Sequence, residues 1–352
     1  MKQGNKQMAE ILNTLGIVKE PGVIEFQTKK MGDVPDAKVR IKIISSAICG
    51  SDLHIFKGMH PSVQLPVTIG HELSGEIVAL GKGCTKFNIG QAVTIEPVIT
   101  CGKCQACLAG DYGYCENISF TYRNGDGGMA NYIDVFEKNV YLLPKGMTYD
   151  QGALIEPLSV ATHAVRRASI GLGDKIIIFG AGAIGLFVTA LSKKNGAAEV
   201  LVVDYSQNRL DFALGLGATY VINPAKESVE EAIAKVSGGT GMDKAFECVG
   251  KEETFVQAMT SIRKNGLVTI VGIFENQHIT IPASRFVTHE IHIQGAQGYC
   301  RDFPIALHFA TELPLERLIT HHFALAALQK AFETAFDKSE NPIKIIVHPW
   351  AE

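Results

Sequence analysis

The distribution of apolar and polar positions divides the chain into two kinds of segment. In the first third, short stretches alternate between apolar and polar residues or become wholly apolar, and many end at glycine. Examples are KVRIKIISSAICG (38–50), GEIVALG (75–81) and GQAVTIEPV (90–98). This pattern predicts β-strands joined by turns. From residue 150 onward, in DQGALIEPLSVATHAVRRA, the apolar residues recur at helical spacing instead, which predicts a helix.

Strand-like and helix-like segments then alternate. Five apolar strands are predicted, at KIIIFG (175–180), EVLVVD (199–204), TYVIN (219–223), DKAFECVG (243–250) and LVTIVG (267–272). Helices are predicted between them, from near Ala183 and within 206–218, 228–238 and 252–266. Such alternation implies a parallel sheet with helices on both faces, so the predicted fold class is α/β. The tail, 314–348, reads as a turn, a helix and a final strand.

Composition narrows the class of protein. The length of 352 residues suggests two domains or one large one. A content of 46% hydrophobic and 20% charged residues is ordinary for a protein with a sizeable core. The net charge of −3 argues against a nucleic-acid partner, which usually requires a basic face.

Two segments bear on the expected location. The N-terminal stretch has no apolar region of the secretory kind. The uncharged segment 176–192 is at the short end for a membrane span. Its glycine spacing favours a buried strand followed by a helix, so no membrane partner is expected. The expected location is the cytoplasm, where thiols stay reduced.

A dinucleotide fingerprint lies between the first two predicted strands of the parallel sheet. Gly180, Gly182 and Gly185 form G-x-G-x-x-G after an apolar strand, and Asp204 ends the next strand. In this context the glycines permit a tight turn, close approach of a pyrophosphate and close helix packing. Asp204 would accept hydrogen bonds from ribose hydroxyls and repel a 2′-phosphate, which favours NAD over NADP. The alternative is three packing glycines and a solvated aspartate.

Four of the eight cysteines lie close together, at Cys101, Cys104, Cys107 and Cys115. Four thiolates around zinc fill a tetrahedron and leave no position for substrate, which is typical of a structural site. The alternatives are disulfides or unrelated buried thiols.

A catalytic zinc needs three protein ligands and an open position. ICGSDLH contains Cys49, GHE contains His71 and Glu72, and ALIEPLS contains Glu156. Each residue is unremarkable by itself, and their spacing alone does not assemble them into one site.

These motifs, taken in order with the four-cysteine segment and FGAGAIG, resemble the zinc-dependent medium-chain dehydrogenases over essentially the whole chain. ALIEPLSVATHAVRR most resembles the polyol branch, typified by sorbitol dehydrogenase. The resemblance implies a GroES-like β-rich catalytic domain in residues 1–165, completed by 297–352, and a Rossmann NAD-binding domain in 166–296. It also implies two zinc ions per chain, one catalytic and one structural, and a homodimer or homotetramer.

The resemblance assigns roles within the catalytic site. Cys49 and His71 match two zinc ligands, and the third place falls to Glu72, to Glu156 or to each in turn. Ser51 and His54 match a proton relay, and the alternative is a helix cap and an exposed histidine. Substrate contacts are expected from Glu156 and Tyr299. Cofactor contacts are expected from Gly180, Gly182, Ala183, Ile184, Gly185, Asp204, Arg209, Val271, Gly272, Ile273 and Gln297.

The match weakens at the substrate positions. Sorbitol dehydrogenases carry a tyrosine where this chain has Ile55, and an arginine where it has Gly298, so sorbitol itself is in doubt. Lys57 and Arg123 would suit a phosphate or acid group, but surface solvation is the preferred explanation. The predicted function is NAD- and zinc-dependent oxidation of a secondary alcohol, foremost a polyol.

Several alternatives stay open at this point. Within the family, the chain would be a polyol-phosphate, sugar-acid, threonine or 2,3-butanediol dehydrogenase. From other classes, a relative that had lost its metal would lack Cys49 and His71. A non-catalytic zinc-ribbon protein would show a basic face, yet residues 102–117 contain one lysine and two acids.

Overall fold

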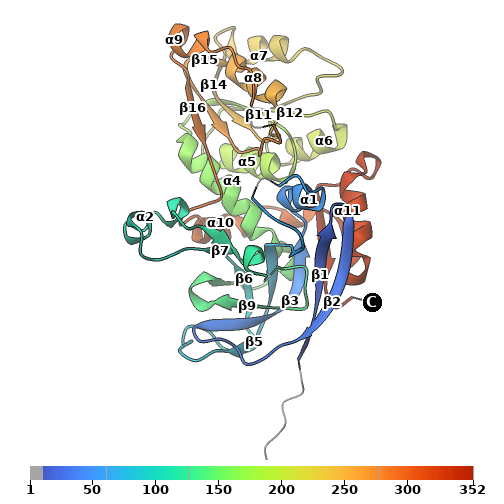
Figure 1. Ribbon diagram of the computed structural model, residues 1–352. Coiled ribbons are helices and arrows are strands. Elements are labelled where there is room, and N and C mark those ends of the chain that lie inside the picture. Colours follow the sequence, from blue (N-terminus) through green and yellow to red (C-terminus); the bar gives the residue numbers. More distant parts are fainter. Residues whose placement is uncertain (1–10, 61, 126, 277, 352) are drawn as a thin grey trace, which may run out of the picture.

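The computed structural model describes residues 11–60, 62–125, 127–276 and 278–351. In Figure 1 the strands of the first third form the lower part of the molecule and the parallel sheet forms the upper part. The long helix α4 (Ile155–Ala168) lies between them. The predicted α/β class with two structural parts is therefore confirmed.

The lower part is built on a seven-stranded sheet with the order β10-β6-β5-β3-β18-β17, in which β9 also pairs with β3. The stretches in which apolar and polar residues alternate form its central strands. Val39, Ile41 and Ile43 of β3 are fully buried beside Ile77 and Val93. The strands are β3 (Lys38–Ala47), β5 (Glu72–Leu80), β6 (Ala92–Ile95), β9 (Tyr132–Phe136), β10 (Val140–Leu142), β17 (Ile319–Ala324) and β18 (Lys344–His348).

Smaller elements surround this sheet. A three-stranded sheet has the order β2-β1-β4, and β7 pairs with β8. Their bounds are β1 (Leu12–Glu20), β2 (Val23–Lys30), β4 (Val67–Thr68), β7 (Val98–Ile99) and β8 (Ser119–Phe120). The short helices of this part are α1 (Gly50–Phe56), α2 (Gln105–Leu108) and α3 (Tyr149–Ala153).

The C-terminal tail joins the first part of the chain. β18 pairs antiparallel with β3, so that Ile346 lies opposite Ala47, and it pairs parallel with β17. The predicted helix is α11 (Leu328–Phe336) and the predicted last strand is β18. The strand β17 and the preceding helix α10 (Phe303–Ala310) were not predicted. Two adjacent histidines interrupt the apolar pattern of β17, which hides it from a periodicity argument.

The upper part is a six-stranded parallel sheet with the order β13-β12-β11-β14-β15-β16. Its strands are β11 (Lys175–Phe179), β12 (Glu199–Val203), β13 (Tyr220–Ile222), β14 (Met242–Glu247), β15 (Ile262–Ile270) and β16 (His292–Gly295). Its helices are α5 (Ala183–Lys194), α6 (Gln207–Gly215), α7 (Val229–Ser237), α8 (Glu252–Ser261) and α9 (Ser284–Thr288). All five predicted strands of this region are present.

Two predictions from the sequence can be compared with this part of the fold. The helix expected over 252–266 ends at Ser261, because Ile262 adopts extended dihedral angles, is buried and begins β15. The apolar stretch 176–192 is the buried strand β11 followed by α5. No helix in the described part of the chain is long and apolar enough to cross a bilayer. The predicted domain boundary between residues 165 and 166 falls within α4. The division of the chain into these two domains stays a prediction.

Candidate active site

Three potential metal ligands from neighbouring elements of the lower part converge. One ligand atom from each of Cys49, His71 and Glu72 lies within 4.8 Å of the other two. Cys49 is the N-cap residue of α1, and Glu72 is the first residue of β5, directly after His71. His71 is 5% exposed and Glu72 is fully buried. A thiol, an imidazole and a carboxylate form a donor set of the kind that holds catalytic zinc, so Cys49 and His71 fit the expected ion together with a neighbouring carboxylate.

Asp52 lies beside the first two of these residues. Its buried carboxylate accepts hydrogen bonds from the backbone N–H of Cys49 (2.9 Å) and of Gly70 (3.3 Å). Its Oδ1 lies 3.6 Å from Nδ1 of His71. Burial disfavours the charged imidazole, but the Asp52 carboxylate and the Cys49 thiol outweigh burial and raise the pKa of His71 well above its usual value. Carboxylates that orient a metal-binding histidine in this way are common. No role for Asp52 is predicted from the sequence.

Lys344 is a second residue that the sequence argument missed. Its ammonium group, at the start of β18, donates to both carboxylate oxygens of Glu72, one of them at 2.6 Å, and to the carbonyl of Ile48 at 3.2 Å. Glu72 therefore already has a cationic partner, and its carboxylate is not a free ligand. The signal in the sequence is a single charge within the apolar strand PIKIIVH.

Glu156 approaches the cluster from the first turn of α4 and is 4% exposed. Burial raises its pKa to about 7, and the Glu72 carboxylate adds to this effect while the charge on His71 opposes it. The buried hydroxyl of Tyr299 has no hydrogen bond of normal geometry within the described residues, yet it lies near enough to lower the pKa of Glu156. The structure thus brings the expected substrate contacts, Glu156 and Tyr299, to one place.

The two relay candidates lie on α1. Ser51 Oγ is 3.5 Å from Nε2 of His71, inside the cluster. His54 follows three residues later, and its Nδ1 lies 3.4 Å from a carboxylate oxygen of Glu275. The His54 side chain is 24% exposed, so the two residues lead from a buried site towards solvent.

The glycine fingerprint forms the turn that was predicted. Gly180 has φ +98°, which side chains rarely adopt, and a Cβ at Gly185 would lie 1.8 Å from the Gly180 carbonyl oxygen. A Cβ at Gly182 would instead meet open space. Gly182 is the N-cap residue of α5, and Ala183 and Ile184 are the first residues of that helix. Free N–H groups at a helix N-terminus beside open space suit a pyrophosphate.

The remaining cofactor candidates gather at the carboxyl ends of the parallel strands. Asp204 follows β12 and accepts hydrogen bonds from the backbone N–H of Ala181 (2.7 Å) and of Ser206 (2.8 Å), which fixes its carboxylate beside the glycine turn. Arg209 on α6 donates to the carbonyl of Pro342 at 2.7 Å. The other four candidates follow β15 and β16; they are Val271, Gly272, Ile273 and Gln297.

Cys101, Cys104, Cys107 and Cys115 also converge, with their sulfur atoms within 4.8 Å of one another. All eight cysteines are free thiols, so the disulfide alternative is not realised in this structure. The backbone N–H groups of Lys103 and Cys104 lower the pKa of the Cys101 thiol to about 6. A thiolate is the form that binds zinc, so this set also fits a metal ion.

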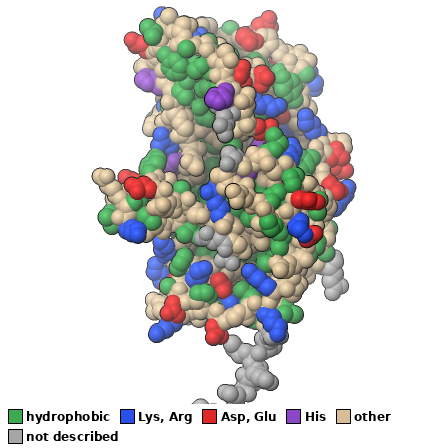
Figure 2. Space-filling model, viewed as in Figure 1, with side chains coloured by type: hydrophobic (Ala, Val, Ile, Leu, Met, Phe, Trp, Pro, Cys, Tyr) green, Lys and Arg blue, Asp and Glu red, His purple; other side chains and the backbone are tan. Residues whose placement is uncertain are grey.

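The segment that carries these cysteines includes α2 and projects from the body of the molecule (Figure 1). On the face that Figure 2 shows, this segment carries both acidic and basic side chains, whereas a nucleic-acid ribbon would need a basic face. Arg301, two residues after Tyr299, connects this segment to the rest of the chain. Its guanidinium donates to the carbonyls of Gly110 (2.8 Å) and Ala109 (2.9 Å).

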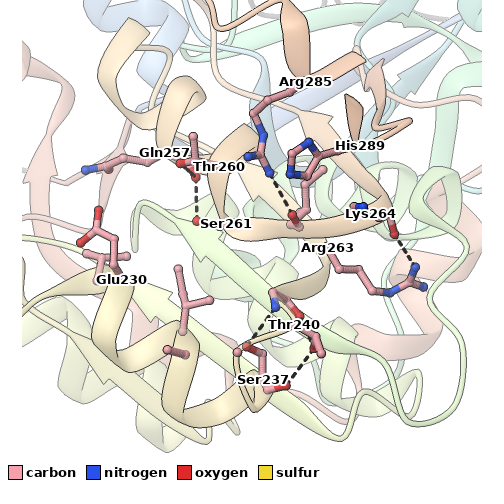
Figure 3. Close-up of a pocket in the computed structure, with 16 residues that line it drawn as sticks. Glu230, Ser237, Thr240, Gln257, Thr260, Ser261, Arg263, Lys264, Arg285 and His289 are labelled. Atoms are coloured by element: carbon pink, nitrogen blue, oxygen red, sulfur yellow. Dashed lines mark hydrogen bonds between the residues drawn. The ribbon is translucent and has the colours of Figure 1, made fainter. Parts of the chain in front are cut away.

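A large cavity lies away from these residues. Its volume is about 660 Å³, and Figure 3 shows Glu230, Ser237, Arg263 and Arg285 around it. It lies at the amino ends of β14 and β15, at the edge opposite the glycine turn. Its guanidinium groups are engaged, since Arg263 pairs with Asp243 and Arg285 donates to the carbonyls of Met259 and Ile262. The cavity is therefore not the dinucleotide site.

Comparisons with known proteins identify the family. Residues 35–145 match the alcohol dehydrogenase GroES-like domain, and residues 183–312 match the zinc-binding dehydrogenase family. Sorbitol dehydrogenase of Bacillus subtilis is 33% identical over 332 residues, which cover 93% of this chain and 94% of that protein.

Two solved structures extend the comparison. The 2R,3R-butanediol dehydrogenase from Bacillus subtilis superposes with a TM-score of 0.87 and is 32% identical, with 96% of this chain and 99% of that one covered. A putative zinc-binding dehydrogenase from Sinorhizobium meliloti, bound to NADP, gives a TM-score of 0.90 at 26% identity, with 96% and 100% covered.

The chain belongs to the zinc-dependent medium-chain dehydrogenases, in the polyol branch that sorbitol dehydrogenase typifies. It is an alcohol dehydrogenase with a GroES-like part and a Rossmann part. The resemblance read from the motifs is confirmed, and the alternatives of a non-catalytic zinc-ribbon protein and a nucleic-acid binder are not supported.

Proposed function

We propose that this protein oxidises a secondary alcohol of a polyol with NAD, at a zinc ion held by Cys49 and His71. The observation that carries the proposal is the buried convergence of these two residues with Glu72. Glu156 is buried nearby and interacts electrostatically with His71 and Glu72. His54 on α1 contacts Glu275, which follows β15 of the parallel sheet. When bound, zinc supplies a Lewis acid that eases loss of an alcohol proton, and NAD supplies the hydride acceptor.

Metal binding and proton transfer fall to different residues of the chain. Cys49 and His71 are the proposed metal ligands, held by Asp52. Because Lys344 occupies both oxygens of Glu72, we assign the third protein position to Glu156, bound directly or through water. Ser51 receives the substrate proton and His54 passes it to solvent, which suits an imidazole.

We further propose that the four-cysteine cluster holds a second zinc ion with a structural role. Its four sulfur atoms complete a tetrahedral site, so no position is left for an alcohol. The loop contains no fully buried apolar side chain between Cys101 and Cys115. Metal bonds would therefore provide much of its folding energy.

We assign NAD as the preferred cofactor. The Asp204 carboxylate is held by two backbone N–H groups beside the glycine turn. A 2′-phosphate would meet this fixed negative charge.

For the substrate, the structure supports a compact polyol or diol. Ile55, which replaces the tyrosine of sorbitol dehydrogenases, is 1% exposed and packs in the core, so it supplies no polar contact. Gly298 supplies no side chain. Lys57 lies over the Phe336 ring at 4.6 Å and Arg123 donates to Ser62 at 2.6 Å, so both cations already have partners. These engagements disfavour a polyol phosphate or a sugar acid.

A substrate panel tests this proposal. Purified enzyme is assayed for NADH formation with polyols, vicinal diols, polyol phosphates, threonine and sugar acids. We expect the highest kcat/KM with an uncharged polyol or diol. A preference of at least about tenfold for a phosphorylated or carboxylated substrate would contradict the proposed class, because this corresponds to about 1.4 kcal/mol of transition-state binding.

We propose a cytoplasmic homo-oligomer, a homodimer or homotetramer. Free thiols at all eight cysteines suit a reducing compartment. β16 is an edge strand of the parallel sheet, and the nearby Val287 is 83% exposed. Exposed edges of this kind are commonly covered by a partner. Light scattering on the purified protein measures the assembly directly.

A further inference from the structure

A third group of metal-binding side chains lies outside both zinc sites described above. One ligand atom from each of Asp150, His322 and His348 lies within 4.8 Å of the other two. The residues come from α3, β17 and β18, so the group joins the middle of the chain to its C-terminal tail. Neither the catalytic cluster nor the four-cysteine segment shares a residue with it.

The strand register explains why the two histidines face the same way. In the parallel pair, His322 lies opposite Ile346 and Ala324 lies opposite His348. Because side chains two residues apart share one face of a sheet, both imidazoles project towards α3. Their rings stack with centroids 5.2 Å apart and an interplanar angle of 23°.

Both imidazoles point their Nε2 atoms at the same carboxylate. Nε2 of His348 lies 2.8 Å from one oxygen of Asp150, and Nε2 of His322 lies 3.1 Å from the other. The Ser45 hydroxyl donates to Asp150 at 2.5 Å and fixes the carboxylate from β3. Ligands around a divalent ion with bonds of about 2.1 Å are separated by about 3.0–3.4 Å, so a small shift of these side chains would admit one.

The three side chains of this site are partly exposed to solvent. The side chains of Asp150, His322 and His348 are 26%, 50% and 32% exposed. Partial exposure lets an ion enter and leaves positions for water. Two imidazole nitrogens with one carboxylate oxygen favour late transition metals such as Zn²⁺ over Ca²⁺ or Mg²⁺, which prefer all-oxygen sites.

From this juxtaposition we propose that Asp150, His322 and His348 form a third divalent-metal site that binds Zn²⁺ and clamps the C-terminal strands to α3. Ser45 acts as a positioning residue for Asp150. The bound ion has no part in alcohol oxidation. Its effect is on stability, because an ion that binds only the folded chain raises the midpoint of unfolding.

Isothermal titration of the tag-free holoenzyme tests the site. The enzyme keeps its resident zinc, which is counted first, and is then titrated with Zn²⁺ in a chelator-free buffer at neutral to slightly alkaline pH. We expect one additional saturable site per chain. His322→Asn and His348→Gln should each weaken this added binding by about tenfold or more, and the double variant should abolish it. His308→Asn is the matched control, since His308 is an exposed histidine on α10, and it should bind as the wild type does.

Thermal unfolding provides a second reading that does not depend on turnover. At about 100-fold excess over its dissociation constant, added Zn²⁺ should raise the midpoint of the wild type by about 2 °C or more, and should not raise that of the double variant. Absence of an additional site would overturn the proposal. Equal Zn²⁺ binding by the double variant would also overturn it, since the ion would then lie elsewhere. Neither result bears on the proposed alcohol oxidation.

Discussion

Lys344 and Glu72, which are 272 residues apart in the sequence, form a buried ion pair beside Cys49 and His71. Their side chains are 4% and 0% exposed. Burial opposes the charge on Lys344, but the Glu72 carboxylate and the Cys49 thiol outweigh it and raise the pKa of the lysine. The pair fixes β18 to β5 and supplies Glu72 with a cationic partner.

Removal of the lysine should therefore lower the free energy of unfolding. Lys344→Met keeps the length of the side chain but leaves the Glu72 charge buried and unpaired. We expect a loss of about 3–5 kcal/mol in the free energy of unfolding, measured by denaturant titration. The double variant Lys344→Met/Glu72→Gln should recover part of the loss. A single variant as stable as the wild type would show that the pair does not hold the two strands together.

A pH dependence is expected at Asp302, the buried residue at the start of α10. Burial opposes its charge, but hydrogen bonds from His163, the Cys300 N–H and Arg166 outweigh burial and lower the pKa of Asp302 below 3.8. A depressed pKa means that the fold favours the carboxylate, so this stability is present above about pH 4 and is lost as the pH falls through the lower native value.

Asp302→Asn should thus destabilise the protein at pH 7 and have a much smaller effect near pH 3. Denaturant midpoints of the wild type and the variant at both pH values measure the difference. Equal destabilisation at the two pH values would rule out an ionic role for Asp302.

Cofactor choice should depend on the charge of Asp204. Asp204→Asn keeps an oxygen that can accept from the Ala181 N–H but removes the negative charge. The preference of kcat/KM for NAD over NADP should fall by about tenfold or more, because a 2′-phosphate no longer meets like charge. A native enzyme that uses the two cofactors equally well would contradict the assignment.

Proton transfer should depend on His54. His54→Ala should slow alcohol oxidation most at low pH, where base in the solvent is scarce, and added imidazole should partly restore the rate. The profile of kcat against pH, with and without imidazole, is the measurement. A profile identical to that of the wild type would remove His54 from the pathway.

Some parts of the site could be predicted from the sequence and others could not. The glycine turn and the four cysteines are local patterns whose spacing dictates their chemistry, and the structure assembles both. Cys49, His71 and Glu156 could be grouped only through family resemblance, because no local rule joins α1, β5 and α4. Asp52 and Lys344 were missed because their roles depend on partners in the folded chain. β17 was not predicted because His321 and His322 interrupt its apolar pattern; His322 faces α3, where alternation alone would place an apolar residue.

The central claim is that chemistry takes place at Cys49 and His71 and not at the four-cysteine cluster. Zinc content and turnover per folded molecule, measured together in Cys49→Ser and Cys104→Ser, test it most directly. Each variant should lose about one zinc per chain. Cys49→Ser should stay folded and bind NADH but show no turnover, whereas the folded fraction of Cys104→Ser should be less stable and turn over almost normally. Wild-type turnover in Cys49→Ser, or a stable and fully folded Cys104→Ser without activity, would contradict the account.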